Sequence, residues 1–260
     1  ARSRAEWWPT ERAPPLLGRS SVAALFVILR APGPGLAQEL YDVVIRGGRV
    51  MDPETGRDEI DNIGILGERI EAITTQEIRG RTTIDASGQI VAPGFIDILA
   101  SIGRNREAHT FKIGDGVTTV LGMHGGPLDV ERYVEEHTAV GPLANYAATV
   151  SHAGLREAVG ATDRYAPATP EPIEAMRPLA VRAIRDGAVG IGFGVNYTPG
   201  ASYEEIFALF EVAAAEGVPC HLHARYKGNV FPLTMSLAAM EVVAIAAATG
   251  AQAQLAHLIS

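Results

Sequence analysis

Short alternations of apolar and polar residues fill the chain between residues 39 and 90. Residues that alternate in this way face opposite sides of a strand, so each stretch predicts a half-buried strand. Gly67-Glu68 separates two of these stretches, as expected for a turn between neighbouring strands. Residues 39–90 are therefore predicted to form a small β-domain, a meander or a sandwich layer, with strands over 41–46, 49–51, 63–66, 69–73 and 82–86.

After residue 90 the pattern changes to apolar runs that alternate with segments of helical periodicity. Ser202 is a candidate N-cap and Gly217 a candidate stop for the second of three helices, and Gly250 ends the third. Pro178 should fray or kink the first turns of the first helix, because proline lacks the N–H of the helical hydrogen bond. The predicted helices cover 172–185, 203–215 and 235–249, and the predicted strands cover 90–99, 117–121, 144–150, 188–194, 218–223 and 251–257.

Strands that alternate with helices predict parallel βα units. Continuously apolar strands fit a barrel, in which the strands are covered on both faces. A complete (β/α)8 barrel takes about 250 residues, and the βα region over 91–260 stops after its sixth strand. The predicted fold class is therefore α/β: a (β/α)8 TIM barrel truncated after about six strands, with a small N-terminal β-sandwich domain.

Residues 1–38 have no periodicity that would build a core. Arg19, the apolar run over 22–29 and the small residues that follow are typical of a secretory signal. The mature protein would then begin near Gln38 or Glu39. A disordered leader or a misassigned start is the alternative. A signal would place the protein in the periplasm or outside the cell, and its absence would place it in the cytoplasm.

Composition narrows the classes of function. The 260 residues carry a formal net charge of −8, whereas a general nucleic-acid binder or a binder of acidic membranes needs a basic surface. The single cysteine excludes an intramolecular disulfide framework and a Cys-rich zinc module. No apolar run approaches the roughly 18–20 residues of a membrane span. We therefore expect neither a nucleic-acid partner nor a membrane span.

Five of the seven histidines follow predicted strands. In a (β/α)8 barrel the catalytic groups lie at the carboxyl ends of the strands. Imidazole is a common zinc ligand, and three protein ligands leave one position for water. Several histidines on one rim therefore favour a metal site over separate structural histidines. The five are His124, His152, His221, His223 and His257, whereas His109 and His137 are predicted to be surface residues.

Seven stretches match the motifs of one family, most specifically in the glycine-rich run from 187 to 200; they are 41–52, 84–97, 115–119, 145–156, 187–200, 223–225 and 256–258. They resemble the metal-dependent amidohydrolase superfamily, and within it the N-acyl-D-amino-acid deacylase (D-aminoacylase) branch. The resemblance covers residues 40–260. It implies a metal-centred (β/α)8 barrel, a small β-domain built from both chain ends, and hydrolysis of an amide at a zinc-bound hydroxide.

The resemblance also implies a set of metal ligands, with a departure at the first barrel strand. The family's strand ends in Phe-Ile-Asp-x-His-x-His, but Leu99 and Ser101 stand here in place of the two histidines, so that metal position is predicted to be lost. The cysteine or glutamate ligand after the second strand is His124 here. The other histidine ligands match His223 and His257, and the expected catalytic Asp after strand eight lies outside this chain. The resemblance thus implies one Zn²⁺ held by three histidines.

Other side chains near these ligands have two interpretations each. His221 either fills the barrel interior or is a further ligand. One interpretation of His152 is that it contacts the substrate or a metal-ligating residue. The other is that it anchors its own loop. Tyr197 and Arg225 are placed to meet a substrate carboxylate, although a salt bridge along the rim suits Arg225 equally. Cys220 points away from His221 and is predicted to be a buried, apolar thiol.

Two classes of function follow. The first is zinc-dependent hydrolysis of a linear amide, namely deacylation of an N-acyl amino acid, with N-acyl-D-amino acids as the implied small-molecule substrates. The second is a non-catalytic or degenerate homologue that keeps the fold and one metal. The strand-end histidines favour the first class, and the loss of the histidine pair at Leu99 and Ser101 favours the second.

Overall fold

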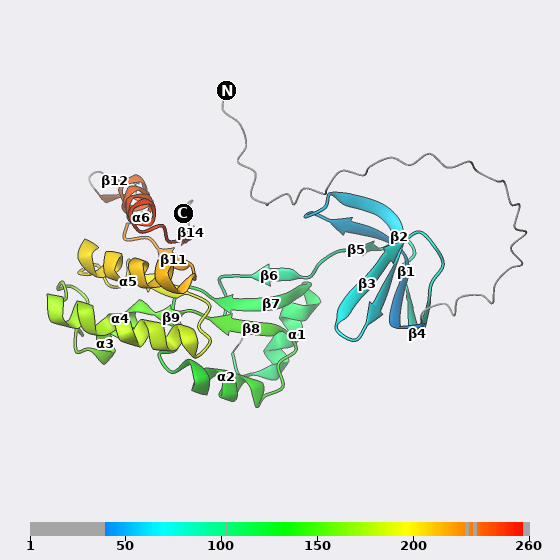
Figure 1. Ribbon diagram of the computed structural model, residues 1–260, viewed down its shortest axis with the longest axis horizontal. Coiled ribbons are helices and arrows are strands. Elements are labelled where there is room, and N and C mark those ends of the chain that lie inside the picture. The colour runs from blue at the N-terminus through cyan, green and yellow to red at the C-terminus, as the bar shows by residue number, and fades with distance from the viewer. Residues whose placement is uncertain (1–39, 102, 227–228, 231–232, 257–260) are drawn as a thin grey trace, which may run out of the picture. The chain divides into compact units, whose positions relative to one another are not determined.

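The computed structural model describes residues 40–101, 103–226, 229–230 and 233–256 (Figure 1). They form two compact units, one ending at Val91 and the other beginning at Ala92. The leader predicted over 1–38 and the predicted ligand His257 lie outside the described residues. None of the helices in these ranges has the length and apolar character that a membrane crossing requires.

The first unit contains a five-stranded sheet in which β1 is the centre. It is antiparallel to β2 and parallel to β4 and β5, and β3 pairs with β2. The register of β1 shifts between Ile45 and Gly48, and Gly47 adopts a φ of 70°, so the predicted break at this point is a bulge inside one long strand. The strands are β1 Leu40–Asp52, β2 Arg57–Leu66, β3 Arg69–Thr74, β4 Arg79–Asp85 and β5 Ile90–Val91.

The buried side chains of the first unit come mostly from β1 and β2. Tyr41, Val44 and Val50 are buried, as is Asp61, whose carboxylate accepts a hydrogen bond from Arg57 Nε at 2.7 Å. Residues 40–91 as described form a single sheet. The sandwich, which needs a second sheet, therefore stays a prediction.

The second unit contains two parallel sheets, one of three strands and one of four, and in each the strands are ordered along the chain (Figure 1). β6 pairs with β7 and β7 with β8, whereas β9 pairs with β10, β10 with β11 and β11 with β14. Only Thr149 separates β8 from β9, so this segment links the two sheets. The strands are β6 Phe95–Asp97, β7 Val117–Gly122, β8 Asn145–Ala148, β9 Val150–Ser151, β10 Ile191–Gly194, β11 Cys220–His223 and β14 Ala253–Ala256, with a separate antiparallel pair, β12 Asn229–Val230 and β13 Leu233–Thr234.

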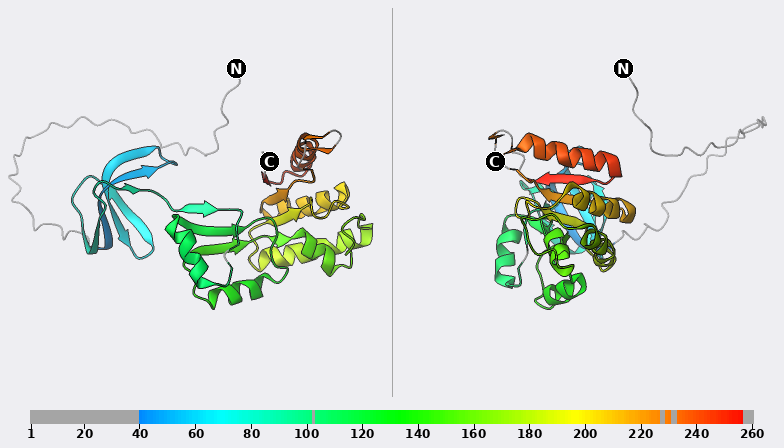
Figure 2. Two further views of the ribbon diagram at one scale, coloured as in Figure 1. Left: turned by 180° about the vertical axis from the view of Figure 1, so that it is seen from behind. Right: turned by 90° about the vertical axis from the view of Figure 1, so that its left-hand side faces the viewer.

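Helices connect these strands, and α4 and α5 lie side by side along the sheet (Figure 2). The predicted caps of α5 are confirmed: Ser202 Oγ accepts from the backbone N–H of Glu205 at 3.2 Å, and Gly217 closes the helix with a φ of 70°. α4 begins ahead of the predicted boundary and continues through Pro178, because its buried face packs on the core on both sides of the proline. The helices are α1 Arg106–Gly114, α2 Val130–Thr138, α3 His152–Ala158, α4 Pro170–Arg185, α5 Tyr203–Glu216 and α6 Met235–Thr249.

The main hydrophobic core lies between β9–β11 and the helices α3–α6. Its largest fully buried apolar side chains include Leu155, Met176, Phe193 and Phe210. A second, much smaller cluster lies beside β7. In contrast to the predicted burial of every strand on both faces, the side chains of Phe95 and Ile96 in β6 are exposed in the described part of the chain.

Candidate functional site

The carboxyl ends of β7 and β11 bring three histidines together. His221 and His223 lie two residues apart on β11, so their side chains leave the same face of the strand, and both are buried. His124 follows β7, and its ring centroid lies 4.9 Å from that of His221 and 5.0 Å from that of His223. Two strands from different sheets therefore supply one cluster.

His124 reaches this cluster because the loop that carries it lies over β10. A Cβ atom on Gly192 would come within 2.6 Å of the Met123 carbonyl oxygen and 2.8 Å of the Gly125 amide nitrogen, so the loop occupies space that a side chain would fill. The Thr149 hydroxyl donates to the Met123 carbonyl oxygen at 3.2 Å. A glycine of the motif over 187–200 thus makes room for the loop of a histidine nearly 70 residues earlier.

The structure brings two of the three predicted ligands, His124 and His223, together. It adds His221, for which sequence reasoning left a barrel-filling and a ligand role open. His257 directly follows Ala256, whose backbone pairs with His223, and lies outside the described residues. Within the described ranges, no group of three or more His, Cys, Asp or Glu side chains is arranged to hold a metal ion. The three-histidine zinc site therefore stays a prediction.

Leu99 and Ser101 lie just beyond the end of β6, and both are exposed. Leu99 forms an isolated bridge with Gly122 at the end of β7, on the segment that leads to His124. Nearby, Lys112 Nζ donates to Asp97 at 2.7 Å, and hydrogen bonds from this ammonium and from the Leu99 amide lower the pKa of the Asp97 carboxyl. Leu99 and Ser101 offer no imidazole for a metal here.

Tyr197 lies in the turn after β10, beside the histidine cluster. Its hydroxyl oxygen is 3.2 Å from Nε2 of His223, and the two rings meet edge to face at 5.0 Å. The tyrosine is mostly exposed, and it also lines a pocket of about 370 Å³ with Arg156, Arg164 and Thr198. It is therefore in a position to contact a molecule that lies over the histidines.

Arg225, just beyond β11, is held by two neighbours. Its Nε and Nη2 donate to the Glu241 carboxylate at 3.1 and 2.8 Å, and its Nη1 donates to the Pro199 carbonyl oxygen at 2.8 Å. Burial works to lower the pKa of Arg225, but the hydrogen bond and charge of Glu241 outweigh it and raise that pKa. This geometry agrees with the salt-bridge interpretation; the predicted contact with a substrate carboxylate would have to compete with Glu241.

His152, the first residue of α3, is fully buried beside a carboxylate. Its Nε2 lies 2.5 Å from Oε1 of Glu205, and Arg156 Nη1 donates to the two oxygens of that carboxylate at 2.7 and 2.6 Å. Burial works to raise the pKa of Glu205, but the hydrogen bonds and charges of His152 and Arg156 lower it overall. The structure thus agrees with the anchoring interpretation of His152, and it shows no exposed surface on His152 for a substrate.

Three predictions about single residues have clear outcomes. His109 and His137 are buried, so their prediction as surface residues is wrong. Each uses one ring nitrogen for a backbone carbonyl, that of Gly103 and that of Tyr133, both at 2.8 Å. His137 lies two helical turns after the buried Val130, a spacing that places both on one face of α2. Cys220 is buried as predicted, and burial raises the pKa of its thiol.

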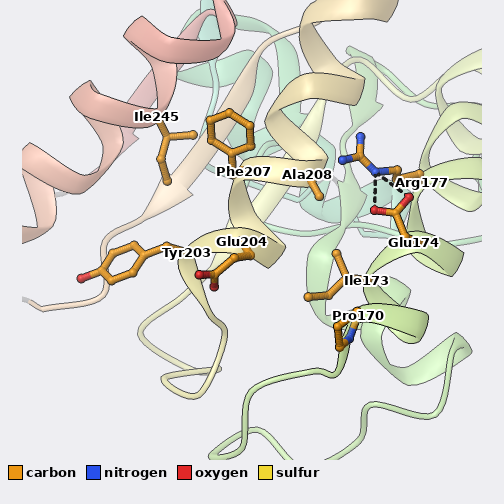
Figure 3. A pocket seen from close by; sticks show the side chains of 9 residues that line it. All are labelled: Pro170, Ile173, Glu174, Arg177, Tyr203, Glu204, Phe207, Ala208 and Ile245. Carbon is orange, nitrogen blue, oxygen red and sulfur yellow. Dashed lines mark hydrogen bonds and ion pairs between the residues drawn. The ribbon is translucent and has the colours of Figure 1, made fainter.

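A groove of about 510 Å³ lies between α4, α5 and α6, and none of the histidines lines it. Figure 3 shows the ion pair of Arg177 with Glu174 at one end of the groove and Tyr203 towards the other. Ile173, Phe207 and Ile245 give the groove an apolar lining. The groove therefore lies on the outer helices and not at the strand ends that carry the histidines.

No protein-family model matches the chain. It is similar to the N-acyl-D-glutamate deacylase of Alcaligenes xylosoxydans xylosoxydans, with 32% identity over 250 residues, which is 85% of this chain and 50% of the relative. It is also similar to the D-aminoacylase of the same organism, with 33% identity over 220 residues, 73% of this chain and 45% of the relative. The chain thus spans about half the length of the curated relatives that it matches.

Solved structures of a deacylase and an aminoacylase with the same names are also similar. The N-acyl-D-glutamate deacylase of Bordetella bronchiseptica, in complex with zinc and a phosphonate inhibitor, matches with a TM-score of 0.73 and 30% identity, covering 83% of this chain and 51% of that chain. A D-aminoacylase structure described through its binuclear metal centre matches with a TM-score of 0.68 and 27% identity, covering 82% and 50%. These similarities support an amidohydrolase-type α/β fold.

Proposed function

Because the chain belongs to the amidohydrolase superfamily, in the branch of the N-acyl-D-amino-acid deacylases, we propose that the complete protein hydrolyses a linear amide with a zinc-activated water. The substrate class is an N-acyl amino acid, and the names of the relatives support the D configuration. The observation that carries the proposal is the meeting of His124 and His223 at the carboxyl ends of two separate strands.

The proposal includes the architecture and the ion. The six strands are the front part of a (β/α)8 barrel, which the length of the relatives and the chain-order pairing of the strands support. Imidazoles bound to one tetrahedral zinc have ring centroids about 5 Å apart, given Zn–N bonds of about 2.0–2.1 Å. The separation of the His124 and His223 rings fits this spacing. His257 is the third ligand, and the lack of histidines at Leu99 and Ser101 supports one ion instead of two.

Each group at the site has a distinct task. When bound, zinc lowers the pKa of a coordinated water to near neutrality. The imidazoles of His124 and His223, at the strand ends, would hold the zinc through a ring nitrogen each. The hydroxyl of Tyr197, 3.2 Å from His223, orients a substrate over the rim by donating a hydrogen bond to its acyl or carboxylate oxygen. The β10 glycine, Gly192, keeps the loop of His124 over the sheet.

Metal analysis tests the site directly. The complete protein should bind close to one zinc, and His223→Ala or His257→Ala should lose it, whereas His137→Gln removes a histidine elsewhere and should keep it. His221→Ala separates the two interpretations of that residue, since a ligand role predicts weaker zinc binding and a barrel-filling role predicts a full complement. Unchanged zinc content in His223→Ala would contradict the proposal.

Activity separates the proposal from the second candidate, a degenerate homologue. The observation that favours this candidate is the Leu99 and Ser101 pair, which leaves strand β6 without imidazoles. Amine release from N-acetyl-D-amino acids, with the L-enantiomers as controls, should be seen in the zinc-loaded complete protein and abolished by His223→Ala. Zinc binding without hydrolysis of either series would favour the degenerate homologue.

A further inference from the structure

We propose that His152, Arg156 and Glu205 form a buried clamp whose task is to position Tyr197 beside His223, so that Arg156 is a positioning residue of the candidate site. Only one part of this proposal rests on the proposed function, namely that Tyr197 contacts a substrate. The clamp is defined by these three side chains, which are almost completely buried.

The clamp joins α3, the loop that follows it and the remote helix α5. His152 and Arg156 belong to α3, and Glu205 lies in the first turn of α5. Arg156 also donates from Nη2 to the carbonyl oxygens of Asp163 and Ala166, both at 2.9 Å, and so fixes the loop after α3. The planar guanidinium therefore binds α5, through Glu205, and the loop after α3 at the same time.

The fixed loop in turn holds the segment that carries Tyr197. The Gly200 amide donates to the carbonyl oxygen of Arg164 at 2.9 Å. A Cβ on Gly200 would come within 2.5 Å of the Ala166 nitrogen, so the two segments touch backbone to backbone. Tyr197 lies three residues before Gly200, in a turn that the Tyr197 amide closes on the Gly194 carbonyl oxygen at 2.8 Å. A contact path therefore runs from Arg156 through the loop to the phenol.

Stability alone is a poor explanation for this arrangement. Taking charges out of water costs several kcal/mol per ion, and apolar residues of similar volume often replace a buried ion pair without loss of stability. What an apolar replacement cannot supply is the directed pair of hydrogen bonds to the Asp163 and Ala166 carbonyl oxygens. Arg156 also lines the pocket beside Tyr197, so the clamp lies in the wall of the space next to the histidines.

The test uses the complete protein with ¹³Cζ-labelled tyrosine, and Tyr197→Phe assigns the Tyr197 resonance. Arg156→Lys keeps a positive charge near Glu205 but cannot donate to the carboxylate and both carbonyl oxygens in the same geometry. We expect the Tyr197 resonance to move towards that of a tyrosine fully exposed to water, in a variant that circular dichroism shows to be folded. Arg177→Lys is the control, because Arg177 forms an ion pair with Glu211 on the outer face of α5.

A second variant covers the case in which Arg156→Lys fails to fold. Arg156→Met combined with Glu205→Met removes both charges and keeps the volume, and the Tyr197 resonance should move in the same way. An unchanged Tyr197 resonance in any folded clamp variant overturns the proposal. Because this readout needs neither metal nor substrate, it is independent of whether the protein is a zinc hydrolase. If the protein is active, Arg156→Lys should raise KM or lower kcat, with zinc content unchanged.

Discussion

The two parallel sheets of the second unit, which form its two halves, bury their apolar residues very differently. Around β9–β11, the strands and the helices α3–α6 enclose Phe193 and Phe210, whose rings lie 5.5 Å apart and are fully buried. Around β6 and β7, Phe95 is 66% exposed and the buried cluster is small. Both halves have apolar strands, so strand composition alone does not decide burial. It depends on whether neighbouring elements cover both faces, and in the described residues β6 has a strand neighbour on one side only.

Truncating one phenylalanine in each half should give the largest contrast. Phe210→Ala removes a fully buried ring and should lower the free energy of unfolding by about 3–5 kcal/mol. Phe95→Ala removes a mostly exposed ring and should change it by no more than about 0.5 kcal/mol. Urea unfolding followed by circular dichroism measures both. Equal losses would mean that β6 is covered in solution, and the contrast between the halves would disappear.

A pair of glycine substitutions sharpens the contrast at the backbone. Gly192→Ala should cost about 1–3 kcal/mol, because the new methyl group meets backbone atoms of the His124 loop that cannot move aside cheaply. Gly114→Ala at the end of α1 has open space around its Cβ and should stabilise the protein by about 0.5–1 kcal/mol. The same unfolding assay checks both, and a neutral Gly192→Ala would show that the loop does not depend on this glycine.

Two carboxylates extend the comparison to the stability of the protein at acidic pH, where the expected effect is smaller. The pKa values of Glu205 and Asp97 are both lowered in the folded protein. Each therefore contributes stability above its unfolded pKa, near 4, and this contribution is lost as the pH falls through the folded pKa. Glu205 is fully buried, whereas solvent screens Asp97, whose side chain is 30% exposed. Melting temperatures between pH 3 and 6 should thus depend less on pH in Glu205→Gln, and only slightly less in Asp97→Asn.

Much of the fold was predictable from the sequence because its local patterns agree with its packing. The strands of the second unit lie at the apolar runs that predicted them, except that Ile90–Val91 of the first run pairs with β1 in the first unit. Ser202, Gly217 and Gly250 cap helices as expected. The exposure of β6 was not predictable, because an apolar run shows only that a strand can be buried. The path of α4 through Pro178 reflects tertiary packing that outweighs a local preference.

The candidate site was predictable only in part. Strand-end spacing and family resemblance selected His124 and His223, which the structure places together. The proximity of His221 depends on a loop that crosses β10, and no local pattern encodes that path. The partners of His152 are similarly remote, since Glu205 follows it by 53 residues. The sequence did contain an indication that His137 is buried, because it lies seven residues after the apolar Val130. This indication was missed because histidine is polar.

The chain-order pairing of β6, β7, β8/β9, β10, β11 and β14 bears on how the protein is made. On a ribosome, each strand within a sheet emerges after the neighbour that it will pair with, so each sheet can grow at one edge in step with synthesis. No described strand of these two sheets has to wait for a distant downstream partner before its first ladder forms. The growing edge stays open until the next strand arrives, and at that stage a nascent chain depends most on protection from other unpaired strands.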